Sequence, residues 1–414
     1  MKNSGKKPFD KKQSFRAQTV VGKGNGCPHF KKCGGCHLQN MTYNEQLKYK
    51  QIKIIKLLGK FCHIKEIMGM ENPVHYRCKV QAAFGKDKSG IISGVYQSST
   101  HKIVPIDSCM IEDEKADEII VTIRKLLKSF KLKPFDENNM TGFLRHVLVR
   151  KGYYTGQIMV VLVTGTPVFP SSRSFINALL QRHPEITTIV QNINNKFTSL
   201  VLGDKNITLY GDGYIEDSIL DCTFRISPRS FYQVNPVMTT KLYSKAIEYM
   251  GLSGKETVID TYCGTGTIGI LASKKAGKVI GVELNADAVR DAKFNAKRNN
   301  IKNIEFYTAD ASDFMVEMAK AGKKADVVIM DPPRAGSDRR FINAAATLAP
   351  EKIVYISCNP ETLERDLTYF ARKGYYAHRI QPVDMFPHTN HVEAVALLSR
   401  KEISKFNEVM KNER

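Results

Sequence analysis

Two residues towards the carboxyl end of the chain have the types needed for covalent catalysis. Cys358 lies in the segment SCNP directly after an expected strand, and Glu393 lies directly before the expected last strand. A thiolate at a strand end is an accessible nucleophile. A carboxylate next to an apolar run is partly desolvated, which raises its pKa as a general base requires. We therefore expect Cys358 to be a nucleophile and Glu393 to be a base.

A glycine-rich turn earlier in the chain has the features of a nucleotide-binding loop. Gly264, Gly266 and Gly269 fit G-x-G-x-x-G between an expected strand and an expected helix. Glycine is needed because a Cβ atom would block both the turn and the approach of a ligand to the backbone. Glu283 ends the next expected strand, nineteen positions after Gly264, about the spacing at which a carboxylate meets a ribose diol. The pattern predicts a nucleoside-containing cofactor.

Three cysteines near the amino end are spaced as ligands of a metal or a cluster. Cys27, Cys33 and Cys36 follow C-x5-C-x2-C, and the two glycines after Cys33 let the chain fold around a centre. This spacing fits zinc and iron–sulfur equally. It leaves the fourth ligand open among Cys62, Cys78 and Cys109.

Charge and composition indicate the kind of partner. The chain has 414 residues, with 62 Lys and Arg against 41 Asp and Glu, a formal net charge of +21. Such an excess in a folded enzyme predicts a polyanionic partner. We find no apolar stretch long enough to span a membrane and no signal peptide core, so we expect a cytoplasmic protein. Nine cysteines without a signal favour reduced thiols over disulfides.

The chain divides into three expected parts. Residues 1–26 are a basic arm, 27–230 form an α+β domain with antiparallel strands, and 231–414 contain seven strands that alternate with helices. This last pattern predicts a doubly wound, Rossmann-like domain with a mostly parallel sheet. Residues 44–60 are expected to form an amphipathic helix whose lysines lie on the solvent side. Arg145, His146, Arg150 and Lys151 share an expected strand, from which they face either phosphate or water.

Five motifs together resemble the RNA uracil-C5-methyltransferase family. They are CPHFKKCGGC, YCGTGTIG, DPPRAG, SCNP and HVEAV, which occur in the family order between about Cys27 and Arg400. The resemblance is closest to members that methylate 23S ribosomal RNA and carry a [4Fe–4S] cluster. It implies a class I methyltransferase domain preceded by a cluster-containing, RNA-binding α+β domain. It also implies S-adenosylmethionine as methyl donor and 23S ribosomal RNA as substrate, with transfer RNA as the alternative.

The same resemblance implies particular site residues. The cluster ligands would be Cys27, Cys33, Cys36 and Cys109. The cofactor contacts would be Gln233, Tyr262, Thr267, Glu283, Asp310 and Asp331. Two features depart from the family pattern: members usually have asparagine where Thr267 stands, and only 26 residues precede Cys27, so the TRAM domain with which many members begin is not expected here.

The chemistry of uracil suggests how Cys358 and Glu393 would act. C5 of uracil is too weak a nucleophile to accept a methyl group unaided. Addition of the Cys358 thiolate to C6 would place enolate character on C5, and Glu393 would then remove the C5 proton. The cluster would be structural, and the uridine must be single-stranded or flipped out to reach the thiol.

Two other classes of protein fit part of the pattern. An NAD-dependent iron–sulfur oxidoreductase would use the glycine turn and the cysteines, but it leaves SCNP and HVE unexplained. A non-catalytic RNA-binding or assembly protein would explain the positive charge but not Cys358 and Glu393. Arg334 follows DPP where amino-group methyltransferases have an aromatic residue, which argues against nitrogen methylation. A monomer is our default expectation.

Overall fold

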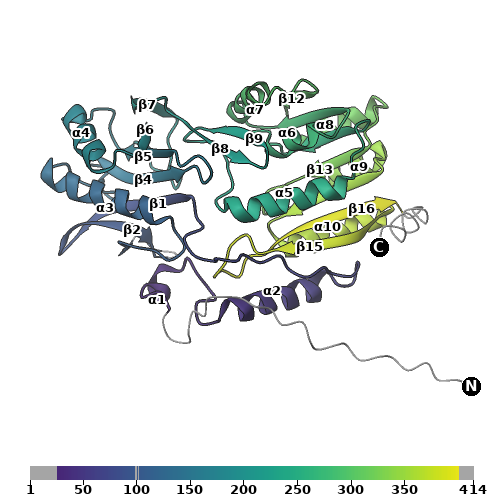
Figure 1. The fold of residues 1–414 in the computed structure, drawn as a ribbon, viewed down its shortest axis with the longest axis horizontal. Coiled ribbons are helices and arrows are strands. Elements are labelled where there is room, and N and C mark those ends of the chain that lie inside the picture. Colours follow the sequence, from purple (N-terminus) through teal and green to yellow (C-terminus); the bar gives the residue numbers. More distant parts are fainter. Residues whose placement is uncertain (1–25, 98–99, 101, 401–414) are drawn as a thin grey trace, which may run out of the picture.

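The computed structural model describes residues 26–97, 100 and 102–400. Two seven-stranded sheets lie side by side, each covered by helices (Figure 1). The expected basic arm, residues 1–26, falls outside the described residues except for Gly26. Within the described ranges, no helix is both long enough and apolar enough to cross a membrane.

The first sheet has the strand order β3-β2-β1-β4-β5-β6-β7. Its strands are β1 (Lys79–Asp87), β2 (Gly90–Tyr96), β3 (Ile103–Pro105), β4 (Leu144–Lys151), β5 (Ile158–Thr164), β6 (Ile186–Ile193) and β7 (Lys205–Tyr210). Helices α3 (Glu114–Ser129) and α4 (Ser172–Arg182) pack together on one face. The strands are antiparallel, as expected, except that β5 and β6 run parallel. That pair differs because the helical crossover α4 returns the chain in the same direction.

The second sheet has the order β12-β11-β10-β13-β14-β16-β15. Its strands are β10 (Thr257–Thr261), β11 (Lys278–Glu283), β12 (Ile304–Thr308), β13 (Val327–Met330), β14 (Lys352–Ser357), β15 (Tyr375–Val383) and β16 (Glu393–Arg400). The first five strands are parallel, and β16 runs antiparallel between β14 and β15. The predicted doubly wound, mostly parallel sheet of seven strands is confirmed.

Helices cover both faces of the second sheet. On one face lie α5 (Pro236–Met250), α6 (Thr267–Ser273) and α7 (Ala286–Arg298), and on the other lie α8 (Ala311–Lys320), α9 (Arg339–Leu348) and α10 (Pro360–Arg372). A two-stranded hairpin, β8 (Ile215–Ile219) and β9 (Cys222–Ile226), joins the two sheets. The apolar core on the α5 face continues through this hairpin to β4, β5 and β6 of the first sheet. The expected domain boundary between residues 230 and 231 therefore stays a prediction.

Strand β4 shows why two arginines cannot meet an external phosphate. Apolar residues cover both of its faces, so its side chains point alternately into two cores. Arg145 is only 2% exposed and pairs with Glu137 at 2.6 Å, and Arg150 donates to the buried carbonyl of Ser230 at 2.6 Å. The suggestion that these arginines face phosphate or water is wrong, because neither face of β4 is open.

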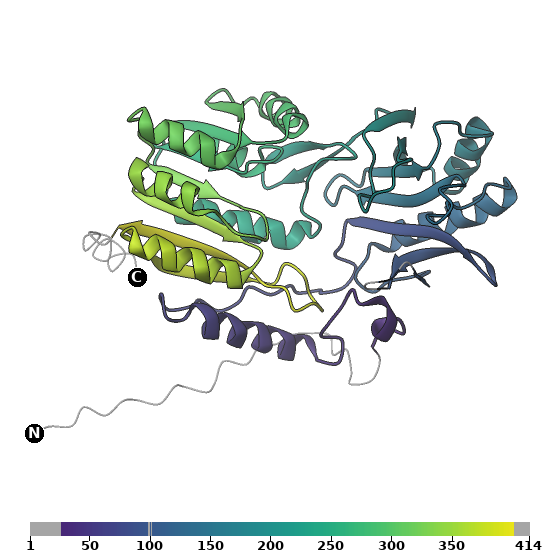
Figure 2. The ribbon, with the colours of Figure 1, turned by 180° about the vertical axis from the view of Figure 1, so that it is seen from behind.

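The two amino-terminal helices, α1 (Phe30–Cys33) and α2 (Tyr43–Leu58), lie against different parts of the molecule, α1 beside the first sheet and α2 beside the second (Figures 1 and 2). Helix α2 runs along the α10 and β15 edge (Figure 1). Lys50 on α2 is fully buried and pairs with the equally buried Asp384, with Nζ and Oδ1 2.5 Å apart. The expectation that the lysines of this helix face solvent is therefore wrong at Lys50, because the β15–β16 connection covers that side.

Breaking this ion pair is expected to destabilise the fold. Lys50→Met leaves the buried Asp384 carboxylate with the Tyr43 hydroxyl as a donor but with no counter-charge, which should lower the free energy of unfolding by about 3–5 kcal/mol. The matched control is Lys53→Met on the same helix, whose pair with Glu361 is partly exposed and worth about 1 kcal/mol at most. Urea unfolding of both variants measures the difference. Equal losses would contradict a special role for the buried pair.

Candidate active site

The glycine-rich turn joins β10 to α6 at the carboxyl edge of the second sheet. Gly264 and Gly266 adopt left-handed backbone angles, with φ of 55° and 81°. A Cβ atom on Gly266 would lie 2.9 Å from the ring of Phe306. The backbone N–H of Gly264 donates to Glu283 Oε2 at 3.0 Å, and Glu283 Oε1 accepts from the N–H of Asn285 at 2.8 Å. The Glu283 carboxylate is thus fixed beside the turn, and its contact with a ribose stays a prediction.

Asp260 at the end of β10 is a buried carboxyl group next to this turn. Its Oδ2 accepts from the N–H of Gly269 at 2.8 Å, which ties the strand to the start of α6. Its Oδ1 has no partner among the described residues. Burial raises the pKa of Asp260 to about 8, and the nearby carboxylates of Asp331 and Glu283 act in the same direction.

The other expected cofactor residues surround the same edge. Tyr262 and Thr267 flank the glycine turn, Asp310 caps α8 after β12, Asp331 follows β13, and Gln233 precedes α5. Tyr262 has a left-handed φ of 61°, and its half-buried ring lies 5.8 Å from that of Phe341. The side chain of Asp310 accepts from the backbone of Ser312 at 2.9 Å. The fold therefore brings these residues together from four separate segments.

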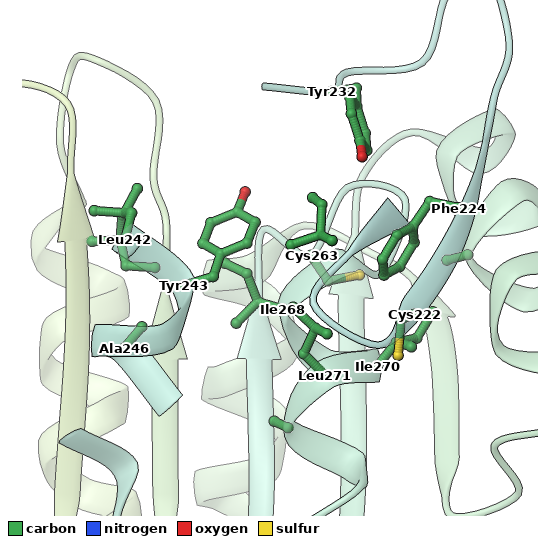
Figure 3. Close-up of a cluster of buried hydrophobic side chains, with 14 of the residues drawn as sticks. Cys222, Phe224, Tyr232, Leu242, Tyr243, Ala246, Cys263, Ile268, Ile270 and Leu271 are labelled. Atoms are coloured by element: carbon green, nitrogen blue, oxygen red, sulfur yellow. The ribbon is translucent and has the colours of Figure 1, made fainter. Parts of the chain in front are cut away.

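Tyr243 on α5 is a member of this site that the sequence analysis missed. Figure 3 shows its hydroxyl pointing out of the apolar cluster, towards the side on which Tyr232 lies. Burial raises its pKa, and the carboxylates of Asp331 and Glu393 add to this shift, whereas a hydrogen bond with Gln233 opposes it. No local signal identifies Tyr243, because it looks like one more apolar position of an amphipathic helix.

Cys358 and Glu393 meet because β14 and β16 are neighbours. Ser357, the last residue of β14, pairs with Ala394 in the antiparallel ladder. Cys358 therefore leaves the end of β14 where Glu393 begins β16. Burial raises the pKa of Cys358 to about 11, and the charges of Glu393 and Asp331 contribute. Burial also raises the pKa of Glu393 to about 8, with a further contribution from Asp331.

The DPPR loop after β13 completes this group. Burial raises the pKa of Asp331 to about 7. The positive charge of Arg334 acts the other way and lowers the pKa values of Cys358 and Glu393. The carbonyl of Arg334 accepts from Asn359 Nδ2 at 3.2 Å, so the loop is tied to the segment that carries Cys358. A thiol, two carboxyl groups and a guanidinium group thus lie together at the carboxyl edge of the second sheet.

The four cysteines expected to bind a cluster line a single cavity of about 500 Å³. Cys27, Cys33 and Cys36 come from the α1 region, and Cys109 comes from the segment before α3. All four are half-buried free thiols, and burial raises the pKa of Cys109 to about 12. Among the described residues, however, no three His, Cys, Asp or Glu side chains form a ready-made metal site. The chemistry and common cavity of these thiols fit a cluster, but their side chains do not converge.

The mixed sheet with helices on both faces has the fold of an α/β methyltransferase. A model of the tRNA (uracil-5-)-methyltransferase family matches residues 42–401. The chain belongs to this family of S-adenosylmethionine-dependent RNA uracil-5-methyltransferases. The family resemblance expected from the five motifs is confirmed.

Individual relatives agree with this assignment. The chain is 45% identical over 377 residues to an uncharacterised RNA methyltransferase of Clostridium tetani, covering 90% of this chain and 82% of the relative. It is 41% identical over 399 residues to another from Bacillus cereus, covering 95% and 87%. It is similar in structure to the tRNA (uracil-54, C5)-methyltransferase of Pyrococcus abyssi in complex with S-adenosyl-L-homocysteine, with a TM-score of 0.74 and 30% identity, covering 88% and 85%.

Proposed function

We propose that this protein methylates C5 of a uridine in 23S ribosomal RNA through a covalent bond between Cys358 and C6. The observation that carries this proposal is the meeting of Cys358 and Glu393 across the β14–β16 ladder. A nucleophile and a base at one strand edge are the two groups that C5 methylation requires. An oxidoreductase would need neither, and a purely RNA-binding protein would have no use for a buried carboxyl group beside a thiol.

Each residue of the site has a proposed part in the reaction. S-adenosylmethionine supplies the methyl group. Arg334 favours the anionic form of Cys358, whose thiolate adds to C6 of the uracil. Glu393 as carboxylate removes the C5 proton after methyl transfer, and the Cys358 thiolate then leaves. The uridine must be flipped out, because a base within an RNA helix cannot reach the Cys358 thiol. It enters at the carboxyl edge of the second sheet.

The cofactor would lie across the glycine turn. We assign Glu283 to the ribose hydroxyl groups, since its carboxylate is already fixed beside Gly264. The remaining contacts proposed are Gln233, Tyr262, Thr267, Asp310 and Asp331. Thr267 is buried and lies 3.4 Å, oxygen to oxygen, from the hydroxyl of Thr265. The Thr267 side chain therefore has a hydrogen-bond partner, although it is shorter than the asparagine that family members usually have there.

Binding of the charged cofactor is expected to release protons near pH 7. The pKa values of Asp331 and Glu393 are raised to about 7 and about 8, so at pH 7 Asp331 is about half protonated and Glu393 is mostly protonated. The sulfonium charge favours the carboxylates, lowers their pKa values and should release about half a proton to one proton per site. Calorimetry in two buffers of different ionisation enthalpy measures this number. S-adenosylhomocysteine, which lacks the charge, is the control, and equal release by both would contradict the prediction.

Tritium release tests the proposed reaction and its substrate. Unmodified 23S ribosomal RNA and transfer RNA, each labelled with tritium at uracil C5, are incubated with the protein with and without S-adenosylmethionine. We expect cofactor-dependent release from 23S ribosomal RNA. Release from transfer RNA alone would favour the second candidate function, which the name of the Pyrococcus abyssi enzyme supports. Release from neither would contradict C5 methylation.

The cysteine cavity is the feature that leads us to favour ribosomal RNA. We propose that Cys27, Cys33, Cys36 and Cys109 bind a structural [4Fe–4S] cluster. Arg77 and Lys79, which line the same cavity, would offset the charge of the thiolates. Iron and sulfide analysis of anaerobically purified protein tests this, and undiminished iron content after Cys109→Ser would exclude that cysteine. We further propose a cytoplasmic monomer.

A further inference from the structure

The connection between β15 and β16 determines where Glu393 lies. Residues 384–392 form this turn, and Glu393 is the first residue after it. No described residue donates a hydrogen bond to the Glu393 carboxyl group. Its place therefore depends on the ladder with β14 and on the shape of the turn. Figures 1 and 2 show the turn reaching away from the sheet towards the amino-terminal segment.

Four consecutive carbonyl groups of this turn are held by distant residues. The pairs are Met385 with Asn235 Nδ2 at 3.0 Å, Phe386 with Lys50 Nζ at 3.0 Å, Pro387 with the Tyr76 hydroxyl at 3.0 Å, and His388 with the backbone N–H groups of His37 and Leu38 at 2.9 and 3.0 Å. These residues lie outside the described strands, so the four carbonyl groups are satisfied by these donors instead of by a neighbouring strand. Three of the four donor sites lie before β1.

His388 is the point at which the contacts converge. It is 2% exposed and has a left-handed φ of 68°, an uncommon conformation for a residue other than glycine. Its Nε2 lies 2.9 Å from the carbonyl of Pro73, so Nε2 carries the hydrogen and Nδ1 accepts from Gln46 Nε2 at 3.2 Å. Gln46 Oε1 in turn accepts from the N–H of His388 at 2.9 Å. One glutamine thus holds both the backbone and the ring.

We propose that Gln46 is a positioning residue for the general base, because it fixes the 384–392 turn so that Glu393 faces the substrate carbon beside Cys358. This inference rests on the proposed function of Glu393. His37 and Leu38 directly follow Cys36 and bind the same residue as Gln46. The cysteine segment and the base therefore share His388 as an anchor.

Glu393 acts in one step of the reaction. After methyl transfer, C5 carries both its methyl group and its hydrogen, and C6 is bonded to Cys358 Sγ. The Glu393 carboxylate takes the hydrogen as a proton, and the electron pair of the C–H bond becomes the C5–C6 double bond. The C6–S bond breaks, and its electrons return to Cys358 as a thiolate. Thiol addition and methyl transfer come earlier and do not use the base, so a misplaced Glu393 should slow only this release.

The experiment is a single-turnover reaction of full-length Gln46→Met protein. The RNA carries tritium at uracil C5 and the cofactor carries carbon-14 in its methyl group. Denaturing gels measure methylated RNA bound to protein, and tritium release measures loss of the proton. We expect tritium release to slow by about tenfold to a hundredfold, with methyl transfer near the wild-type rate, so that the methylated covalent adduct accumulates.

The control is Gln51→Met on the same helix. Gln51 binds the backbone of Lys65 and Ile67 instead of the turn, and its variant should leave both steps unchanged. If Gln46→Met fails to fold, His388→Asn removes the ring contacts with Gln46 and Pro73 from the other side, and asparagine tolerates the left-handed backbone. Equal slowing of both steps, or no slowing, at an unchanged melting temperature would overturn the inference. Absence of any adduct with wild-type protein would instead contradict the proposed function.

Discussion

Cys358→Ala is expected to abolish methylation while leaving RNA and cofactor binding intact. Alanine cannot add to C6, so C5 stays too weak a nucleophile to accept the methyl group. Loss of a covalent nucleophile lowers turnover on the order of 10⁴-fold to 10⁶-fold. Binding should persist because Cys358 is a small, half-buried side chain at a strand end, and an uncharged thiol is not a phosphate-binding group. Tritium release and filter binding of the same RNA measure the two properties separately.

A matched cysteine variant controls for general damage. Cys62 is also a half-buried free thiol whose pKa burial raises to about 11, but it packs on the far apolar core, away from the strand edge. Cys62→Ala should keep its activity. Measurable turnover by Cys358→Ala, or lost turnover by both variants, would remove Cys358 from the mechanism.

The second large effect is expected from Glu393→Gln, which retains the shape of the side chain but cannot accept the proton. General base catalysis contributes about 10²-fold to 10⁴-fold, and turnover should fall by that amount. Cys358 still adds and the methyl group is still transferred, so the covalent RNA–protein adduct should accumulate on denaturing gels. Glu351→Gln, at an exposed position before β14, is the control. A variant that releases methylated RNA at the wild-type rate would show that another group removes the proton.

The same substitution should also change how stability depends on pH. The pKa of Glu393 rises from its usual 4.5 to about 8 on folding, so the native state binds more protons than the unfolded state between these values. Its contribution therefore lowers the free energy of unfolding as pH rises from about 4.5 to about 8. Glutamine removes this contribution, so Glu393→Gln should be the more stable protein at pH 8.5. Urea unfolding at pH 5.5 and pH 8.5 measures both slopes, and parallel slopes would mean that Glu393 is not buried as an acid.

Much of the fold and several features of the candidate site were predictable because they depend on short stretches of chain. Alternating apolar strands and helices predict the doubly wound sheet. The φ values of Gly264 and Gly266 explain why glycine is required between β10 and α6. Parallel strands end at one edge, so the residues that follow them must gather there. Cys358, Glu283 and Asp331 end or follow such strands, so their common position at this edge could be predicted from the sequence.

Only the tertiary structure decided which elements cover each face of a helix or strand. An apolar stripe predicts a buried side, but it cannot show that Lys50 on the opposite side meets Asp384 from a distant turn. Arg150 is buried for the same reason, since both faces of β4 are covered.

The meeting of Cys358 and Glu393 also depends on tertiary structure. The sequence by itself determined that Cys358 directly follows one strand and that Glu393 stands where another begins. Their proximity follows from the insertion of β16, antiparallel, between β14 and β15, and that insertion depends on pairing between strands far apart in the chain. Local periodicity carries no information about such pairing, because the same alternation of side chains suits either neighbour and either direction.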